Sequence, residues 1–168
     1  MIVEPYPEAG FESSDRRFLV RVPHSVIDRV THVAREGLPD ETGGLLLGTY
    51  SGRHSVLTLR DALPPPLDSI RSRRTFVRGT MGLSDLVGGV LVDGHLARIV
   101  GEWHSHPASA SRPSPTDQAQ MVWAAARRLF GCPTPILLII GNEFADPDDW
   151  TVTVFPRLRP PVPTRRQW

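Results

Sequence analysis

The sequence comprises 168 residues, of which 40% are hydrophobic, so one domain with a substantial core is expected. Its 19 basic and 18 acidic residues leave a formal charge of +1, which gives no reason to expect nucleic acid or an anionic membrane surface as a partner. The single cysteine, Cys132, excludes an intrachain disulfide and fits a cytoplasmic protein. We expect no signal peptide in the N-terminal MIVEPYPEAG and no membrane helix, because no apolar run approaches about 20 residues.

The N-terminal part of the chain shows alternating strand and helix patterns. Residues 1–15 are polar and include two prolines, so we expect a loose segment there. Alternating apolar residues predict a strand over 17–22, and apolar residues at i, i+3, i+4 and i+7 predict a helix over 24–35. Two further strands are expected over 41–50 and 54–59, joined by a Ser-Gly-Arg turn.

The middle of the chain is expected to be less regular. Residues 62–74 are rich first in proline and then in arginine, which predicts a loop, and residues 75–77 predict a short strand. A helix is expected over 81–91, although two of its residues are consecutive glycines, which weaken a helix.

The C-terminal part again shows regular patterns. A strand is expected over 97–100, the longest helix over 115–130, and two buried strands over 135–141 and 150–155. The helical residues expected to form the inner stripe are Met121, Ala124, Ala125 and Leu129, and Trp123 is expected to serve the core or other packing rather than a cofactor. The tail, 157–168, is rich in proline and arginine and is expected to be disordered or partner-dependent.

Strands that alternate with helices predict an α/β fold, in which helices pack on a mixed, curved sheet. The sequence shows no internal repeat and no second domain. The predicted organisation is therefore a single domain over residues 16–156, between the loose segment 1–15 and the tail 157–168.

The residues with the clearest chemistry lie in 101–117, GEWHSHPASASRPSPTD. His104 and His106 are two residues apart, so in a strand both imidazoles lie on the same face. Asp117 falls in the first turn of the predicted helix, from which its carboxylate can reach the two histidines. Two histidines and one carboxylate are a common protein contribution to a catalytic zinc site, which keeps its fourth position for water.

The same residues also have purely structural interpretations. Ser114 as N-cap, proline at the first helical position and Asp117 at the third together form a helix-start signal. In that interpretation Asp117 only satisfies backbone N–H groups, and each histidine is only a hydrogen-bonded side chain near a strand end. The combination favours a metal site, because a capped first turn holds a third ligand rigidly.

A hydrolytic zinc site also needs a general base, and Glu41 at the start of ETGGLLLG supplies one. The glycines that follow, Gly43 and Gly44, are expected to let a substrate backbone come close. They do not form a phosphate-binding loop, because neither Gly-Lys-Ser/Thr nor a helix follows them.

The chain resembles the JAMM (MPN+) zinc metalloproteases, whose motif is a distant Glu plus H-x-H-x(n)-S-x-x-D. Every position of that motif is present, as Glu41, His104, His106, Ser114 and Asp117. The resemblance covers roughly Phe18 to Phe155, which is most of the chain.

The resemblance implies a role for each motif residue. His104, His106 and Asp117 are expected to bind one zinc ion per chain. Glu41 is expected to accept a proton from the attacking water and pass it to the leaving amine, and Ser114 to donate a hydrogen bond to the oxyanion. The implied fold is the cytidine-deaminase-like αβα sandwich, and the implied substrate is a peptide or isopeptide bond after the tail of a ubiquitin-like protein.

The residues just before the histidine pair favour one branch of this family. Many eukaryotic members carry Trp-Tyr there, whereas this chain has Glu102-Trp103 and resembles the prokaryotic branch that accompanies E1-like and E2-like proteins in defence or mobile-element operons. Such proteins are therefore expected as further partners. By strand alternation Glu102 shares the face of His104, where it is either a hydrogen-bond partner of that ligand or a salt-bridged acid.

Three other functions remain open at this stage. The chain could be a non-catalytic scaffold, although such family members typically lack part of the ligand set. It could instead process a sulfur-carrier protein or a small peptide. A zinc deaminase is disfavoured, because Cys132 stands alone where that class has a Cys-x-x-Cys pair.

The loop over 62–74 contains three arginines with two possible roles. Arg71, Arg73 and Arg74 are either solvated or contacts for an acidic patch on a protein partner.

Overall fold

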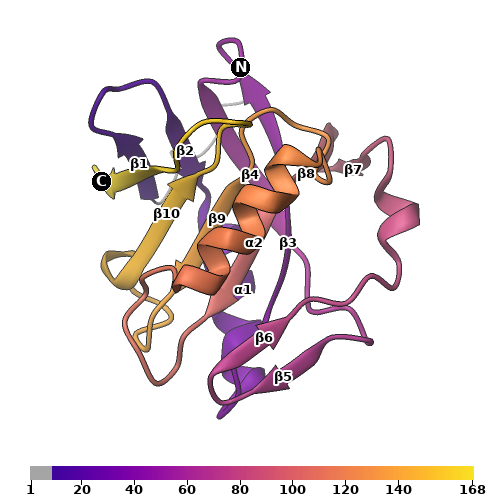
Figure 1. The fold of residues 1–168 in the computed structure, drawn as a ribbon, viewed down its shortest axis with the longest axis vertical. Helices are drawn as coiled ribbons and strands as arrows, with labels where there is room; N and C mark the ends of the chain where they lie inside the picture. Colours follow the sequence, from indigo (N-terminus) through magenta and orange to yellow (C-terminus); the bar gives the residue numbers. More distant parts are fainter. Residues whose placement is uncertain (1–8) are drawn as a thin grey trace.

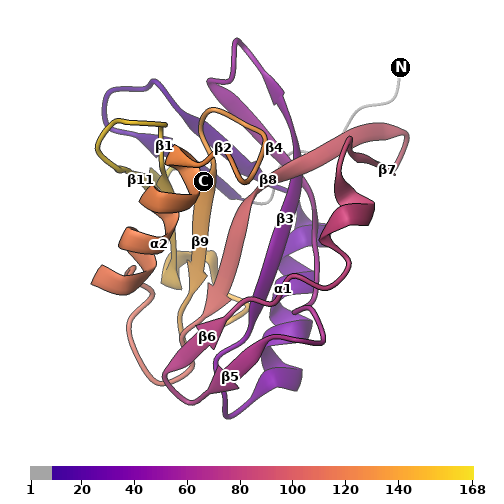
Figure 2. The same cartoon turned by 45° about the vertical axis from the view of Figure 1, so that its right-hand side comes forward.

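The computed structural model describes residues 9–168 and has three layers, with one curved sheet between two helices (Figure 1, Figure 2). The strands are β1 (Ala9–Ser13), β2 (Leu19–Val22), β3 (Gly43–Ser51), β4 (Val56–Ala62), β5 (Ile70–Ser72), β6 (Thr75–Val77), β7 (Val90–Val92), β8 (His95–Ser105), β9 (Ile136–Ile140), β10 (Trp150–Val154) and β11 (Val162–Arg166). The helices are α1 (His24–Gly37) and α2 (Pro115–Ala126), with short 3-10 turns η1 (Leu83–Leu86) and η2 (Pro147–Asp149).

The large sheet is mixed and nearly closed. Its strand order is β3-β4-β2-β1-β11-β10-β9-β8-β7, and an additional pairing between β3 and β8 joins distant strands of that order into a barrel-like wall. Strands β8 and β9 are parallel, as are β2 and β4, whereas the other neighbours are antiparallel. The predicted mixed, curved sheet of an αβα sandwich is therefore confirmed.

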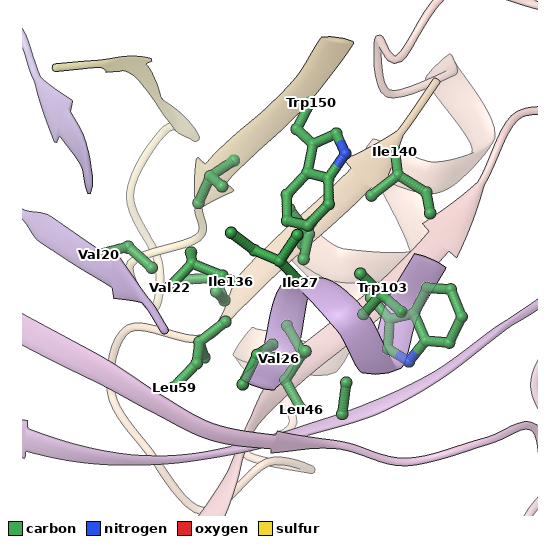
Figure 3. Close-up of a cluster of buried hydrophobic side chains, with 14 of the residues drawn as sticks. Val20, Val22, Val26, Ile27, Leu46, Leu59, Trp103, Ile136, Ile140 and Trp150 are labelled. Atoms are coloured by element: carbon green, nitrogen blue, oxygen red, sulfur yellow. The ribbon is translucent and has the colours of Figure 1, made fainter. Parts of the chain in front are cut away.

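Strand β9 shows how the sheet buries both faces. Its five residues, ILLII, are all buried, and successive side chains point to opposite faces. On one face Ile136, Leu138 and Ile140 join a cluster with the apolar side of α1 (Figure 3). On the other face Leu137 and Ile139 pack with α2. Each side chain buried in this way contributes about 1.5–3 kcal/mol to folding, so β9 and its neighbours anchor the fold.

Most of the predicted regular elements are confirmed, with one clear error. The helix predicted over 24–35 extends to Gly37, and the buried strands 135–141 and 150–155 correspond to β9 and β10. The helix predicted over 81–91 is wrong, because only η1 forms there and β7 follows it. The glycines at 82, 88 and 89 have φ of 82°, 91° and 98°, a left-handed backbone that a right-handed helix does not contain.

Helix α2 is shorter than predicted. It ends at Ala126, and Arg128 follows with a left-handed φ of 56°, so the chain turns away before Leu129. The inward stripe is confirmed for Met121, which is buried, but Leu129 and Trp123 are both 54% exposed. The prediction that Leu129 packs inward is therefore wrong. Trp123 is not a core residue, and its ring packs against the guanidinium of Arg127.

The loop predicted over 62–74 contains one strand of a small hairpin, β5–β6. Its base is closed by the Asp68 carboxylate, which accepts hydrogen bonds from the backbone N–H groups of Thr80 and Met81, at 2.9 and 3.0 Å. The strand predicted over 75–77 is confirmed as β6, whereas β5 was missed because its side chains are all exposed and give no apolar alternation.

Both terminal segments contribute strands. The loose N-terminal segment was predicted over 1–15, but residues 9–13 form β1, while residues 1–8 lie outside the described part. The expected disorder of the tail is wrong for β11, which pairs with β1 and β10 despite its proline. Among residues 9–168, no helix is long and apolar enough to cross a membrane.

Candidate functional site

Strand β8 carries the histidine pair into the α2 side of the sheet. Trp103 points to the α1 cluster, so the alternation of the strand directs His104 to the opposite face. The His106 N–H donates to the Ile140 carbonyl at 2.8 Å, which continues the strand geometry to the second histidine. Both histidines are buried, and the predicted shared face is confirmed.

The N-terminus of α2 fixes Ser114 and Asp117. The Asp117 N–H donates to the Ser114 hydroxyl oxygen at 3.1 Å, and the Ser114 N–H donates to Asp117 Oδ2 at 2.8 Å. This capping box confirms the helix-start interpretation of the sequence. It does not exclude the functional one, because a hydroxyl that accepts here still has its own O–H to donate, and a carboxylate has further lone pairs.

Asp117 faces both histidines. His104 Nδ1 lies 3.6 Å from Asp117 Oδ1, and His106 Nε2 lies 3.9 Å from Asp117 Oδ2. The other nitrogen of His106, Nδ1, is 3.0 Å from the Ala110 carbonyl oxygen, which orients that ring. The structure therefore brings together the three side chains expected from the motif.

Glu41 lies directly before β3 at the same end of the sheet. It is buried, and its N–H donates to the Ser72 carbonyl at 2.8 Å. Burial raises the pKa of its carboxyl, while the nearby charges of His106 and His104 act in the opposite direction. A carboxylate with a raised pKa is a better proton acceptor, so this environment suits a general base.

The other charged groups of the site lie close enough to shift one another's pKa. Burial alone would lower the pKa of His104. The carboxylates of Asp117 and Glu102 outweigh that effect, so the pKa is raised to about 9. Burial likewise acts to raise the pKa of Asp117, yet contacts with His104 and Ser114 lower it to about 2. The His104 imidazolium and the Asp117 carboxylate thus form an ion pair.

The donor set fits a zinc ion by its chemistry and approximate spacing. Two ligands of a tetrahedral zinc, each about 2.0–2.2 Å from the ion, lie roughly 3.4 Å apart. The separations of 3.6 and 3.9 Å between Asp117 and the two histidines are only slightly wider. Over residues 9–168, however, no three His, Cys, Asp or Glu side chains are already arranged closely enough to hold a metal. Small side-chain movements would therefore accompany binding.

Three residues beside the histidines extend the site. Glu102 lies with its Oε2 at 3.6 Å from His104 Nε2 and its Oε1 at 2.8 Å from Arg78 Nε. The salt-bridge interpretation of Glu102 is therefore confirmed by Arg78, while its 3.6 Å contact with His104 is longer than a hydrogen bond. Phe76 contacts the His104 ring edge-on, with centroids 5.1 Å apart. Arg78 and Phe76 were not anticipated, because no local signal links the 75–78 stretch to β8.

A cavity of about 180 Å³ opens beside these residues, between the end of β6 and α2. Its polar end contains His104 and Asp117, with Glu102 and Arg78 along one side. Its outer part is lined by residues that include Val77, Gln120, Trp123 and Leu129. Trp123 and Leu129, both exposed, thus line a cavity that reaches His104.

The glycines after Glu41 have a different role from the one expected. A Cβ on Gly43 would collide with the Trp103 carbonyl oxygen, and one on Gly44 with the Leu63 carbonyl oxygen. These glycines are therefore required by the close approach of neighbouring segments of the chain itself. The expectation that they open space for a substrate backbone finds no support in this geometry.

The fold is shared with a solved protein from Desulfitobacterium hafniense. Its solution structure matches with a TM-score of 0.53 at 23% sequence identity, covering 86% of each chain. The family model described as prokaryotic homologs of the JAB domain matches residues 23–154. The chain therefore belongs to the prokaryotic JAB family, and the resemblance to JAMM (MPN+) proteins seen in the motif is confirmed.

Two curated relatives carry names that refer to hydrolysis. A protein of Enterobacter hormaechei subsp. hoffmannii, named CD-NTase/cGAS isopeptidase, is 32% identical over 158 residues, which is 94% of this chain and 87% of the relative. A protein of Sinorhizobium fredii, named as a probable metalloprotease, is 25% identical over 134 residues, 79% of each chain. These names support a protease or isopeptidase as the activity class of the family members.

Proposed function

We propose that this protein is a zinc metalloprotease that hydrolyses the peptide or isopeptide bond after the C-terminal tail of a ubiquitin-like protein. The observation that carries this proposal is the convergence of His104, His106 and Asp117 in a buried site next to Glu41. Two histidines, a carboxylate and an adjacent carboxylate base form a set of groups suited to metal-assisted amide hydrolysis.

The site residues would have three roles: holding the metal, transferring a proton and stabilising the oxyanion. The two histidines and Asp117 would hold the ion, which supplies polarisation of the scissile carbonyl and a more acidic water. Glu41 would accept the proton of the attacking water and deliver it to the leaving amine nitrogen. The Ser114 O–H would donate to the developing oxyanion, while its oxygen still accepts from the Asp117 N–H as the helix cap.

The groove suggests how a polypeptide reaches the site. It starts at His104 and Asp117 and continues past Val77 and Trp123, which combine apolar surface with access to solvent. An extended tail is narrow enough to follow such a path, and its carbonyl end would then lie at the polar end of the groove. A small polar substrate would leave the exposed apolar part of the groove unused.

The partner proteins are also part of the proposal. Because related proteins are named CD-NTase/cGAS isopeptidases, a CD-NTase conjugate is the first isopeptide substrate to test. E1-like and E2-like proteins that build such a conjugate would be its functional partners.

The direct test is cleavage of a ubiquitin-like protein fused through its C-terminal glycine to a reporter, using protein purified with zinc. Glu41→Gln should keep zinc but lower kcat by about 10²–10⁴-fold, because it removes a general base. His104→Ala should lose both zinc and cleavage. The matched control is Glu36→Gln, which changes an exposed carboxylate on α1 that pairs with His32.

Two results would contradict the proposal. Wild-type protein that contains no zinc by elemental analysis would remove the metal from the reaction. Near-normal cleavage by Glu41→Gln would remove Glu41 from its role. Zinc binding without cleavage of any fusion or conjugate would instead point to a non-catalytic member of the family.

A further inference from the structure

The two histidines are oriented in similar ways but by different partners. Each directs one ring nitrogen at Asp117. The second nitrogen of His106 faces the Ala110 backbone carbonyl, at 3.0 Å, whereas that of His104 faces the Glu102 carboxylate, at 3.6 Å. A partner on the second nitrogen is what usually fixes the orientation of a metal-binding histidine.

Glu102 is itself held in place. Its Oε1 accepts a hydrogen bond from Arg78 Nε at 2.8 Å, and the two side chains are only 14% and 15% exposed. A second nitrogen of Arg78 donates to the Gly79 carbonyl, also at 2.8 Å. A nearly buried ion pair contributes little to stability by itself, because desolvation offsets its attraction. Its position against His104 offers another reason for its presence.

The faces of the His104 ring are restricted as well. Phe76 from β6 lies edge-on to it, with an angle of 74° between the ring planes. Gly43, the residue opposite His104 in the β3–β8 register, lies so close that an added Cβ would come within 3.0 Å of the ring. The imidazole is thus confined between β3 and β6, with little freedom to change its rotamer.

We infer that Arg78, Glu102 and Phe76 are positioning residues that hold His104 in the orientation in which it binds the metal. This inference rests on the proposed zinc site and deepens it. It makes the β5–β6 hairpin region part of the site, because Phe76 and Arg78 come from it and Ser72 accepts the Glu41 N–H. Glu102 and Arg78 also line the groove, so a contact with substrate is the alternative that the test must separate.

The test compares zinc affinity, measured on substrate-free protein by competition with a chelator, with kcat and KM on the fusion substrate. Glu102→Gln keeps the shape of the side chain and should weaken zinc binding by about 10–100-fold. Arg78→Lys keeps the charge but not the guanidinium geometry, and should cause a smaller loss in the same direction. Glu36→Gln and Arg35→Lys, both exposed on α1, are the matched controls and should change neither quantity.

Nitrogen NMR of the histidine rings in the metal-free protein gives a readout that does not depend on activity. Glu102→Gln should shift the Nε2 signal of His104 and leave that of His106 unchanged, because only His104 faces Glu102. Phe76→Leu should keep the apolar volume but loosen the ring, with zinc binding weakened and KM unchanged.

The outcomes distinguish this inference from the proposed function. Wild-type zinc affinity in Glu102→Gln together with an increased KM would overturn it, since the pair would then contact substrate while the zinc protease remained. Wild-type behaviour in every measurement would also overturn it. If Glu102→Gln does not fold, zinc affinity is measured in Arg78→Lys instead. Unchanged zinc affinity in folded Arg78→Lys would overturn the inference. Absence of zinc from the wild-type protein would overturn both proposals together.

Discussion

Two regions of the molecule differ strongly in how much of their surface is buried. One is the strand pair β8–β9. The other is the segment of residues 63–94 that leads from β4 to β8, which we call the excursion. The residues of β9 are fully enclosed, and the second half of β8 is almost as well covered. The excursion instead exposes apolar side chains such as Leu67, Val87 and Leu91, at 91%, 81% and 73%. The strand pair carries the stability of the fold, whereas the excursion presents side chains that other molecules can contact.

The two regions meet along β7, which pairs with the start of β8, and again at the candidate site. At that site the excursion supplies Phe76 and Arg78, which contact residues of β8, and Ser72, whose carbonyl accepts a hydrogen bond from the Glu41 N–H. The two candidate metal-binding histidines lie at the enclosed end of β8, whereas Val77 and Arg78, on one side of the cavity beside them, come from the less enclosed excursion. Because Phe76 contacts His104 and Arg78 contacts Glu102, changes in this part of the excursion would also affect the proposed metal site.

The largest stability contrast is expected between a leucine from each region. Leu138→Ala should cost about 2–5 kcal/mol, because Leu138 is fully buried in the α1 cluster and its loss leaves a cavity. Leu91→Ala removes an equal side chain that is mostly exposed, so its effect should stay within about 0.5 kcal/mol. Denaturant unfolding of both variants measures the difference. Equal losses would show that the excursion is as important to folding as the centre.

An effect of intermediate size is expected at Ser114, where helix stability and chemistry overlap. Loss of one oxyanion donor should lower kcat by about 10²–10³-fold in both Ser114→Ala and Ser114→Gly. Loss of the cap should cost about 1 kcal/mol of stability in the alanine variant but only a few tenths, roughly, in the glycine variant. Parallel melting curves and kinetics check this separation. If kcat instead fell only in the less stable alanine variant, Ser114 would act as the helix cap alone.

The smallest effect is expected from the exposed arginines of the hairpin. Replacing Arg71, Arg73 and Arg74 together by serine should raise KM about tenfold at low salt with kcat nearly unchanged, if they contact an acidic patch on a partner. The difference from wild type should shrink as salt is added, since exposed charges are screened. Arg35→Ser on α1 is the matched control. An unchanged KM would show that these arginines are solvated and do not contact the partner.

Local patterns predicted the elements that are buried or capped by their own neighbours. The strand ILLII, the helix over 24–35 and the Ser114–Asp117 capping box all follow from residues a few positions apart. The patterns failed where distant residues decide the structure. Strand β11 depends on pairing with β1 from the opposite end of the chain, and the segment after β6 depends on Asp68, which binds the backbone at 80 and 81.

The sequence by itself determined the family, the order of the strands and helices around the motif, and the residue types that could bind a metal. Strand alternation placed the two histidines on one face, because side chains in a strand repeat every second residue. Only the tertiary structure placed Glu41 beside them and brought Arg78 and Phe76 against Glu102 and His104. Those contacts join segments that lie some 25 to 65 residues apart, and their formation depends on how β3, β6 and β8 pack together, which no local pattern encodes.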